Sequence, residues 1–194
     1  MVRGVFSCVD SVALWYPQCI HPIDILIAFL VLLTAALAVT MILNLVVLRV
    51  PYIPTSARVA RAMVRFAELK GTETIMDLGA GDGRVLIEAL HIHPKLTAIG
   101  IEYVPTVWLI GKLLIRWHRV PAELRLGDAL KADVSKADAI FLYMSPNLMK
   151  KLQKKFDAEL RKGTPVISHT FRFEGREPVA ETAVGREKIR KYVW

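Results

Sequence analysis

The chain has 194 residues, of which 54% are hydrophobic and 23% charged, and its formal net charge is +8 at pH 7. So strong a positive charge in a short chain indicates an anionic surface nearby, either a nucleic acid or a bilayer with acidic headgroups. The two cysteines and five histidines form no ligand cluster in the sequence, which excludes the common Cys/His metal centres.

Residues 1–22 form a short segment ahead of a long apolar run. Both cysteines, Cys8 and Cys19, lie in this segment. An even pair in an oxidising compartment could close a small disulfide loop, and two unrelated thiols near a membrane surface are the alternative. Neither cysteine has the neighbours of a metal site or of a nucleophile.

An uncharged run follows, over residues 25–48. As a helix with a rise of about 1.5 Å per residue it would measure roughly 36 Å, which exceeds the hydrocarbon core of a bilayer, about 30 Å thick. Buried helices of soluble proteins seldom run this far without a charge. A cleaved signal peptide would have a shorter apolar run and a small-residue cleavage site. We therefore predict one retained transmembrane helix within residues 23–50.

The two flanks of this helix differ in charge. The N-terminal flank holds one arginine against two aspartates, Asp10 and Asp24. The C-terminal flank, by contrast, carries Arg49, Arg58, Arg61, Arg65 and Lys70 against Glu68 alone. The positive-inside rule then predicts an outer N-terminus, with the rest of the chain in the cytoplasm, or in the matrix of a mitochondrion.

A second helix is predicted over residues 55–69, with Thr55 or Ser56 as its cap. Arg58, Arg61 and Arg65 recur at three- and four-residue spacing and form one basic stripe along it. Directly after a membrane span, such a stripe suits headgroup phosphates, and an ordinary solvated face is the alternative. Aromatic and basic residues do not interleave as they do where bases stack, so we expect a bilayer as partner and no nucleic acid.

The densest motif is the run at residues 77–84, which reads D-L-G-A-G-D-G-R between a β-prone segment and a helical one. A strand, a glycine turn and a helix let backbone N–H groups and a helix N-terminus approach a cofactor closely. The spacing D-x-G-x-G-x-G differs from the dinucleotide fingerprint G-x-G-x-x-G. It is typical of S-adenosylmethionine-dependent methyltransferases with a Rossmann-like seven-stranded sheet. A glycine turn without a ligand is the alternative.

The remaining chain alternates predicted strands and helices as one domain, residues 51–194. Glu102 ends the second strand, about twenty residues beyond the glycines, where it could accept hydrogen bonds from ribose hydroxyls. The alternation implies an α/β fold with a mainly parallel sheet. Beyond the glycine motif, strands are expected at 96–101, 122–126, 139–143, 164–170 and 188–194, and helices around 107–117 and 147–160.

These motifs resemble those of the membrane-anchored seven-β-strand protein lysine methyltransferases. That family includes the enzymes that modify the mitochondrial adenine nucleotide translocase and the ATP synthase c-subunit. Residues 51–55 look like its Pro-aromatic-x-Pro motif, residues 77–84 match its D-[IL]-G-[SA]-G-D-G-R, and residues 100–102 resemble its G-x-E. Residues 171–173 lie near a similar motif after the fifth strand.

The resemblance implies a cofactor site and an acceptor site. In the methyltransferase pattern, Asp128 lies beside the adenine. Tyr143 is the candidate for orienting the acceptor, or else packs only against the cofactor, and Thr55 lies near the acceptor in the resembled family. The expected S-adenosylmethionine-binding residues are Asp77, Gly79, Gly81, Asp82, Gly83, Arg84, Glu102 and Asp128.

The chemistry needs few catalytic groups. The sulfonium methyl is already activated, so positioning donor and acceptor supplies most of the acceleration. A lysine acceptor must first lose a proton, which a dry pocket favours by lowering its pKa. We therefore expect a membrane-anchored methyltransferase that modifies a lysine of a membrane-associated protein without a metal. Methylation of a lipid or lipophilic small molecule, and non-catalytic cofactor binding at a membrane, are the alternatives.

Overall fold

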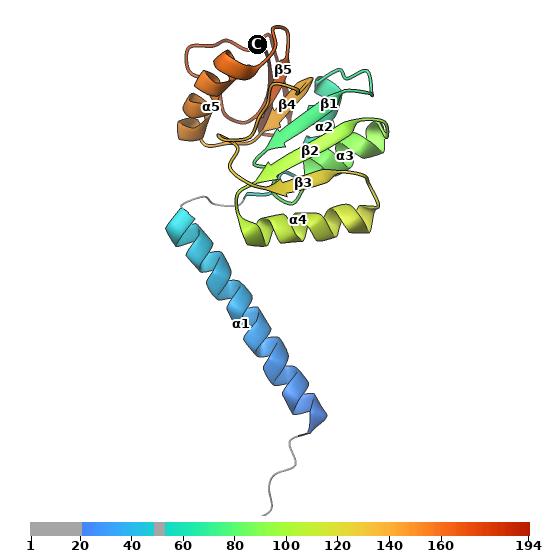
Figure 1. Cartoon of the computed structure of the whole chain (residues 1–194), viewed down its shortest axis with the longest axis vertical. Helices are drawn as coiled ribbons and strands as arrows, with labels where there is room; N and C mark the ends of the chain where they lie inside the picture. Colours follow the sequence, from blue (N-terminus) through green and yellow to red (C-terminus); the bar gives the residue numbers. More distant parts are fainter. Residues whose placement is uncertain (1–20, 49–52) are drawn as a thin grey trace, which may run out of the picture.

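The computed structural model describes residues 21–48 and 53–194 (Figure 1). The predicted pairing of Cys8 with Cys19 and the start of the folded domain at residue 51 lie outside these residues. Helix α1 (Pro22–Leu48) occupies the apolar run. Among the described helices it is the one whose length and composition suit a membrane span, with a mean hydropathy of 2.6 over Pro22–Thr40.

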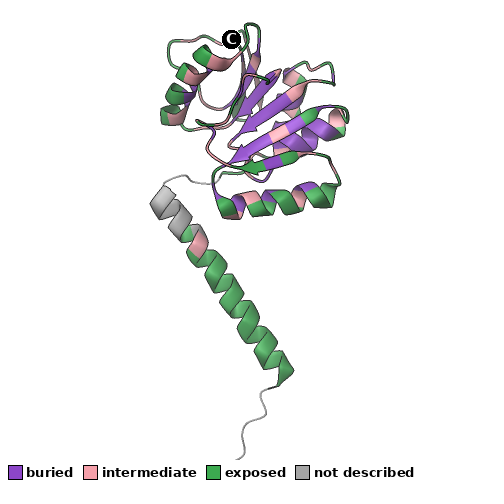
Figure 2. Ribbon diagram, viewed as in Figure 1, coloured by how far each residue is buried: buried purple, intermediate pink, exposed green. Residues whose placement is uncertain are grey.

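Two hydroxyl groups of α1 form hydrogen bonds within the helix. The Thr34 hydroxyl donates to the Val31 carbonyl at 2.9 Å, and the Thr40 hydroxyl donates to the Ala36 carbonyl at 2.7 Å. Residues 21–39 are all exposed (Figure 2). A helix whose hydroxyls bond its own carbonyls and whose apolar side chains face outward suits a lipid environment.

The rest of the chain folds around a seven-stranded sheet in the order β3-β2-β1-β4-β5-β7-β6. Strands β1 to β5 run parallel, and β7 runs antiparallel to both β5 and β6. This is the Rossmann-like sheet expected of class I methyltransferases. The strands are β1 (Thr74–Leu78), β2 (Thr97–Glu102), β3 (Glu123–Leu126), β4 (Ala139–Leu142), β5 (Pro165–His169), β6 (Ala180–Val184) and β7 (Glu187–Val193).

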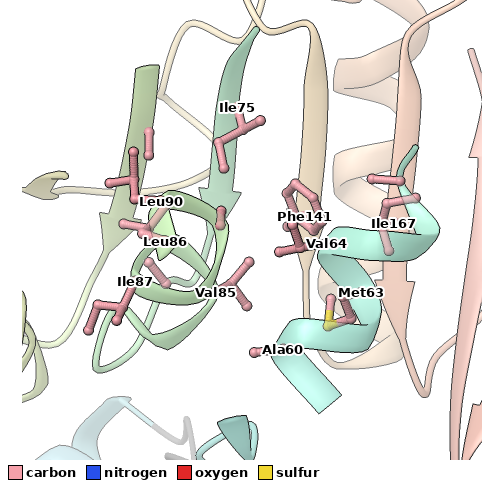
Figure 3. Packing of buried hydrophobic residues seen from close by; sticks show 14 of the residues in the cluster. Ala60, Met63, Val64, Ile75, Val85, Leu86, Ile87, Leu90, Phe141 and Ile167 are labelled. Carbon is pink, nitrogen blue, oxygen red and sulfur yellow. The ribbon is translucent and has the colours of Figure 1, made fainter. Parts of the chain in front are cut away.

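Helices cover both faces of the sheet. Helices α2 (Ala57–Phe66), α3 (Arg84–Ile92) and α4 (Pro105–His118) contribute to one core cluster, and α5 (Pro146–Glu159) packs in a second cluster on the other face. Successive residues of a strand point to opposite faces, so Ile75 enters the first cluster and Met76 the second. Figure 3 shows α2 and α3 side by side over the strands, with Phe141 and Ile167 beneath them.

Helix α2 begins as its sequence indicated. The Ser56 hydroxyl accepts the Val59 N–H at 3.3 Å, so Ser56 rather than Thr55 is the cap. The three arginines of the basic stripe are exposed. Arg61 pairs with the buried Glu88 of α3 at 2.7 Å, so this member of the stripe joins two helices.

Candidate functional site

A cavity of about 410 Å³ opens where the parallel strands end. Loops after β1, β2, β3 and β4 meet there, which is the crevice where open α/β sheets bind ligands. The cavity brings together nine of the ten residues that the sequence singled out: Thr55, Asp77, Gly79, Gly81, Asp82, Arg84, Glu102, Asp128 and Tyr143. Their individual roles stay predictions.

The tenth residue, Gly83, is the N-cap of α3 and has a left-handed conformation with a φ of 76°. A Cβ built there would lie 3.0 Å from Ile115 Cδ1. Gly79 is also left-handed, with a φ of 73°, and a Cβ on it would lie 2.7 Å from Met144 Cε. These two positions require glycine because the turn must bend sharply and leave room for its neighbours.

Hydrogen bonds fasten this glycine turn to the end of β2. The Gly79 and Ala80 N–H groups donate to the Ile101 carbonyl at 2.8 and 3.0 Å. Glu102 accepts the Gly81 N–H at 2.8 Å on one oxygen and the Val104 N–H at 2.8 Å on the other. A carboxylate offers about four acceptor sites, so Glu102 can hold the turn and still accept hydroxyl groups from a ligand.

Three carboxyl groups lie together where the glycine turn meets the end of β2, which we call the cofactor side of the cavity. All three are buried: Asp77, Asp82 and Glu102. Asp82 is neutralised by Arg84, whose Nη2 lies 2.6 Å away. Burial, reinforced by the negative charges of Glu102 and Asp82, raises the pKa of Asp77 from 3.8 to about 8. Such a site favours a ligand that carries positive charge, because a cation would relieve the repulsion between the carboxylates.

A histidine that was not a candidate from the sequence lies behind Thr55 and Tyr143, on what we call the acceptor side of the cavity. His169, at the end of β5, is 3% exposed. Its Nδ1 lies 3.5 Å from Thr55 Oγ1, and its Nε2 lies 3.0 Å from Glu187 Oε2. The rings of His169 and Tyr143 have centroids 4.2 Å apart. Burial lowers the pKa of His169, and this effect is larger than the increase caused by Glu187. The imidazole is therefore favoured in its neutral form.

A signal for His169 was present in the topology. Leu142 of β4 pairs with Ser168 of β5, so the next residues, Tyr143 and His169, lie side by side where these two strands end. Parallel strands bring such end residues to one edge of the sheet. Both strands were predicted from the sequence, but of these two end residues only Tyr143 was a candidate.

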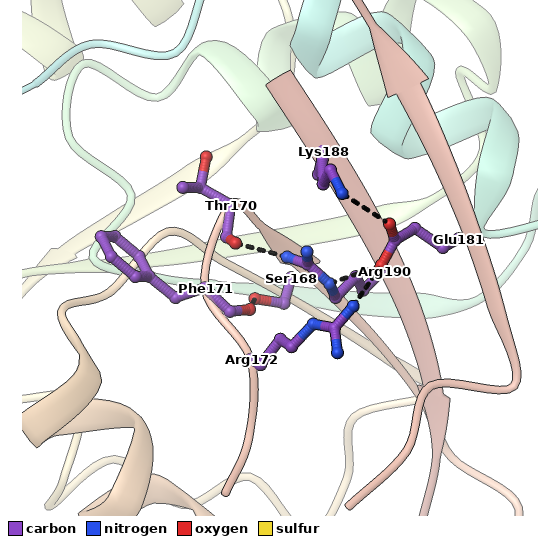
Figure 4. Close-up of polar contacts among 7 residues, drawn as sticks. All are labelled: Ser168, Thr170, Phe171, Arg172, Glu181, Lys188 and Arg190. Carbon is purple, nitrogen blue, oxygen red and sulfur yellow. Dashed lines mark hydrogen bonds and ion pairs between the residues drawn. The ribbon is translucent and has the colours of Figure 1, made fainter. Parts of the chain in front are cut away.

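The turn after β5 places Phe171 in the cavity wall, and Figure 4 shows the contacts that hold this turn. The buried Arg190 donates to the Thr170 carbonyl, and its Nε donates to Glu181 at 2.7 Å. The Ser168 hydroxyl donates to the Phe171 carbonyl at 2.7 Å. The Phe171 ring is thereby fixed near Tyr143, with centroids 5.9 Å apart.

A second cavity, of about 480 Å³, shares Ile101, Gly127 and Asp128 with the first. Its other lining residues include Met76 and Arg125 but no residue of the glycine turn. It therefore lacks the three carboxyl groups of Asp77, Asp82 and Glu102. Within residues 21–48 and 53–194, no cluster of three or more His, Cys, Asp or Glu side chains is arranged to hold a metal ion.

Comparison with known proteins gives a consistent result. The family described as ANTKMT methyltransferase domain matches residues 77–180. A protein-lysine N-methyltransferase of Saccharolobus islandicus is 31% identical over 131 residues, covering 66% of this chain and 81% of that protein. The mouse adenine nucleotide translocase lysine N-methyltransferase is 30% identical over 152 residues, covering 75% of this chain but only 63% of its own length.

A solved structure shares both fold and sequence. It is an RNA methyltransferase from Salinibacter ruber in complex with S-adenosyl-L-homocysteine. The TM-score is 0.70 and the identity 30%, over 73% of this chain and 93% of that one.

Proposed function

The chain belongs to the ANTKMT methyltransferase family and uses S-adenosylmethionine, and on that basis we propose that it is a membrane-anchored enzyme that N-methylates a lysine of a membrane-associated protein. The relatives named as lysine methyltransferases support lysine as the methyl acceptor. The observation that supports a substrate in the membrane is that residues 53–55, which follow the apolar helix closely in the chain, line the cavity.

The cofactor side of the cavity fits S-adenosylmethionine. When bound, this cofactor supplies an activated methyl group on a positively charged sulfonium. Asp77 and its neighbouring carboxylates would compensate the positive charges, and Gly79 and Gly81 would allow close backbone approach. Glu102 would accept ribose hydroxyls with its remaining lone pairs, and Asp128 would lie beside the adenine.

The acceptor side fits an uncharged amine. The aromatic side chains of Tyr143 and Phe171 make this side of the cavity apolar, and an apolar pocket lowers the pKa of a lysine. The neutral imidazole of His169 contacts the Thr55 hydroxyl, which lines the cavity. Thr55 and Tyr143 would orient the amine, and His169 would position both and draw a proton away through the hydroxyl.

The anchor would hold this acceptor side close to the bilayer. Leu48 ends α1, and Ile53 already lines the cavity. Five residue steps of extended chain reach at most roughly 18 Å, so the cavity lies within that distance of the end of the span. The excess of arginine after the span supports a cytoplasmic or matrix location for the cavity. Anchoring raises the effective concentration of a substrate in the same membrane.

The proposal is tested by finding the methyl acceptor. Membranes that contain the full chain are incubated with S-adenosylmethionine labelled in its methyl group, and the label is sorted into protein, lipid and RNA. We expect the label on lysine in membrane proteins, located by mass spectrometry. At a limiting cofactor concentration Asp77→Asn should lower the label by about tenfold, and Glu123→Gln, on the exposed part of β3, should not. Label in the lipid extract or in RNA would contradict the lysine substrate.

The orientation needs a separate test. In sealed vesicles with the outer face exposed, a membrane-impermeant thiol reagent applied after mild reduction should label Cys8 and Cys19. Protease added from the same side should leave the domain after the span intact. Digestion of that domain in intact vesicles would overturn the predicted topology.

A further inference from the structure

Helix α4 turns an apolar face toward the outside of the domain. Its four exposed large apolar residues are Leu109, Ile110, Leu113 and Trp117, with Leu113 61% and Trp117 82% exposed. On a helix these positions fall within one stripe. Figure 2 shows α4 exposed along its outer side at the edge of the domain. A contiguous apolar stripe of this kind marks an interaction surface.

The charged residues of α4 and of its C-terminal cap have one sign. Lys112 and Arg116 are exposed next to the stripe, and the exposed Arg119 ends the helix. Between Pro105 and Arg119 the chain carries no Asp or Glu. Apolar residues with a tryptophan and a basic flank suit the interface of an anionic bilayer. A second copy of the chain would bring two basic flanks together, which repel each other.

Exposed apolar residues also stand at the mouth of the cavity, which we call its lip, and the chain leads from them into α4. Tyr103, 54% exposed, and Ile53, 58% exposed, both line the cavity. Tyr103 stands two residues before α4 begins, and Ile53 lies within roughly 18 Å of the end of α1. The exposed apolar residues thus follow the chain from the span to the cavity and on into α4.

The inner side of α4 is fixed to the cofactor turn. A Cβ on Gly111 would lie 2.6 Å from Leu124 Cδ2 and 3.0 Å from the Gly81 carbonyl oxygen. The helix therefore packs backbone to backbone against the glycine turn, and it cannot shift without moving that turn. A surface that holds α4 would also set how the cavity faces.

We propose that the outer face of α4 lies in the interfacial region of an anionic phospholipid bilayer, so that the lip of the cavity faces the membrane. The inference rests on the proposed function, because this orientation helps the enzyme only if its substrate lies in the membrane. With α1 as anchor and α4 as a second contact, the domain is held in one orientation, and lysines close to the headgroups are the ones presented to the cavity.

The contact is measured in the full chain with its cysteines replaced, Cys8→Ser and Cys19→Ser. A fluorophore is placed through Leu113→Cys, and a matched control uses Lys151→Cys, exposed on α5. The protein is reconstituted in vesicles of phosphatidylcholine with or without phosphatidylserine, including brominated lipids as quenchers. We expect several-fold stronger quenching at position 113 than at 151, and an increase with phosphatidylserine. Equal quenching at the two positions overturns the proposal. Fluorescence changes that follow protein density instead of lipid would identify a second copy as the occupant and overturn it too.

A functional arm separates this contact from the anchor. The double variant Leu113→Glu/Trp117→Glu should lower methyl transfer to membranes by about tenfold, because the domain is no longer held at the surface. Its S-adenosylmethionine affinity and its retention in alkaline-washed membranes should not change. Val179→Glu, at an equally exposed apolar residue outside α4, should behave as wild type. Unchanged transfer by the double variant contradicts the proposal. Release of the wild-type chain by alkali would contradict the transmembrane anchor. The contact of α4 with lipid is tested separately, by the quenching at position 113.

Discussion

The two sides of the cavity are built in different ways. The cofactor side comes from the strand ends and loops after β1, β2 and β3, with Glu102 tied in place by two backbone hydrogen bonds. The acceptor side draws Thr55, Tyr143 and Phe171 from three distant parts of the chain. Substitutions on the first side should therefore act on cofactor affinity, and substitutions on the second on turnover. Four variants test this division.

Glu102→Ala should have the largest effect on affinity. It removes the acceptor of the Gly81 and Val104 N–H groups as well as the expected ribose partner. A hydrogen bond to a charged group contributes about 1.5–3 kcal/mol, so S-adenosylmethionine should bind roughly ten- to more than a hundredfold more weakly. Titration calorimetry measures the change, with Glu123→Ala as the exposed control. Wild-type affinity in a folded Glu102→Ala protein would remove Glu102 from the cofactor site.

Asp77→Asn should weaken the cofactor by about tenfold and change its pH dependence. The pKa of Asp77 is raised to about 8, so the carboxylate that a cation needs forms only as the pH rises toward that value. Wild-type affinity should therefore increase up to about pH 8 more steeply than the affinity of the variant. Comparing the two proteins cancels the titration of the ligand itself. Parallel profiles would show that Asp77 does not face the bound charge.

The same substitution should act on stability in the opposite direction. The folded state keeps a proton on Asp77 that the unfolded chain loses above its ordinary pKa of 3.8. The free energy of unfolding of the ligand-free protein should fall between that pH and about pH 8 and then level off. The Asp77→Asn protein has no ionisable group at this position, so its free energy of unfolding should not fall in this way. Its Tm at about pH 8 should exceed that of the wild type, with the difference vanishing near pH 4. A lower Tm at every pH would contradict the burial of an ionisable group.

His169→Asn should lower kcat by about tenfold while leaving cofactor affinity unchanged. Burial places the pKa of His169 below its ordinary 6.5, so wild-type kcat should decline only in mildly acidic solution, as the imidazole takes up a proton. The variant should lose this acidic limb. A fall in kcat with the acidic limb retained would assign that limb to another group and leave His169 a packing role.

Thr55→Val should have the smallest effect. It removes the hydroxyl beside His169 and keeps the shape of the side chain, so a loss of about 1 kcal/mol, or roughly fivefold in kcat, is expected. Ser56→Ala is the matched neighbour. It removes the cap of α2 and should lower Tm without changing kcat. If both variants reduce kcat equally, the effect comes from the start of α2 and not from the Thr55 hydroxyl.

Several elements followed from local pattern, and others did not. The described helices all lie where the sequence predicted them, because each has a cap, a proline or a long apolar run. The strand β6 was missed. Its residues alternate between intermediate and exposed, and it lies at the edge of the sheet, so a hydrophobic run was lacking. The apolar residues of α4 were recognised, but they cover so much of the helix that periodicity could not tell which ones face outward.

Sequence alone was enough to predict the alternating strands and helices, the glycine turn and the apolar helix ahead of the domain, and to name the residues expected to bind the cofactor. These predictions rest on patterns within short segments: a turn that needs glycine, a strand that ends in a carboxylate, and an alternation of strands and helices that favours parallel pairing. The folded structure was needed to show that His169 stands beside Thr55 and Tyr143, that Gly83 packs on Ile115, and that α4 leaves an apolar stripe uncovered. Each of these depends on the register between strands and on what packs against each helix face, which no local pattern encodes.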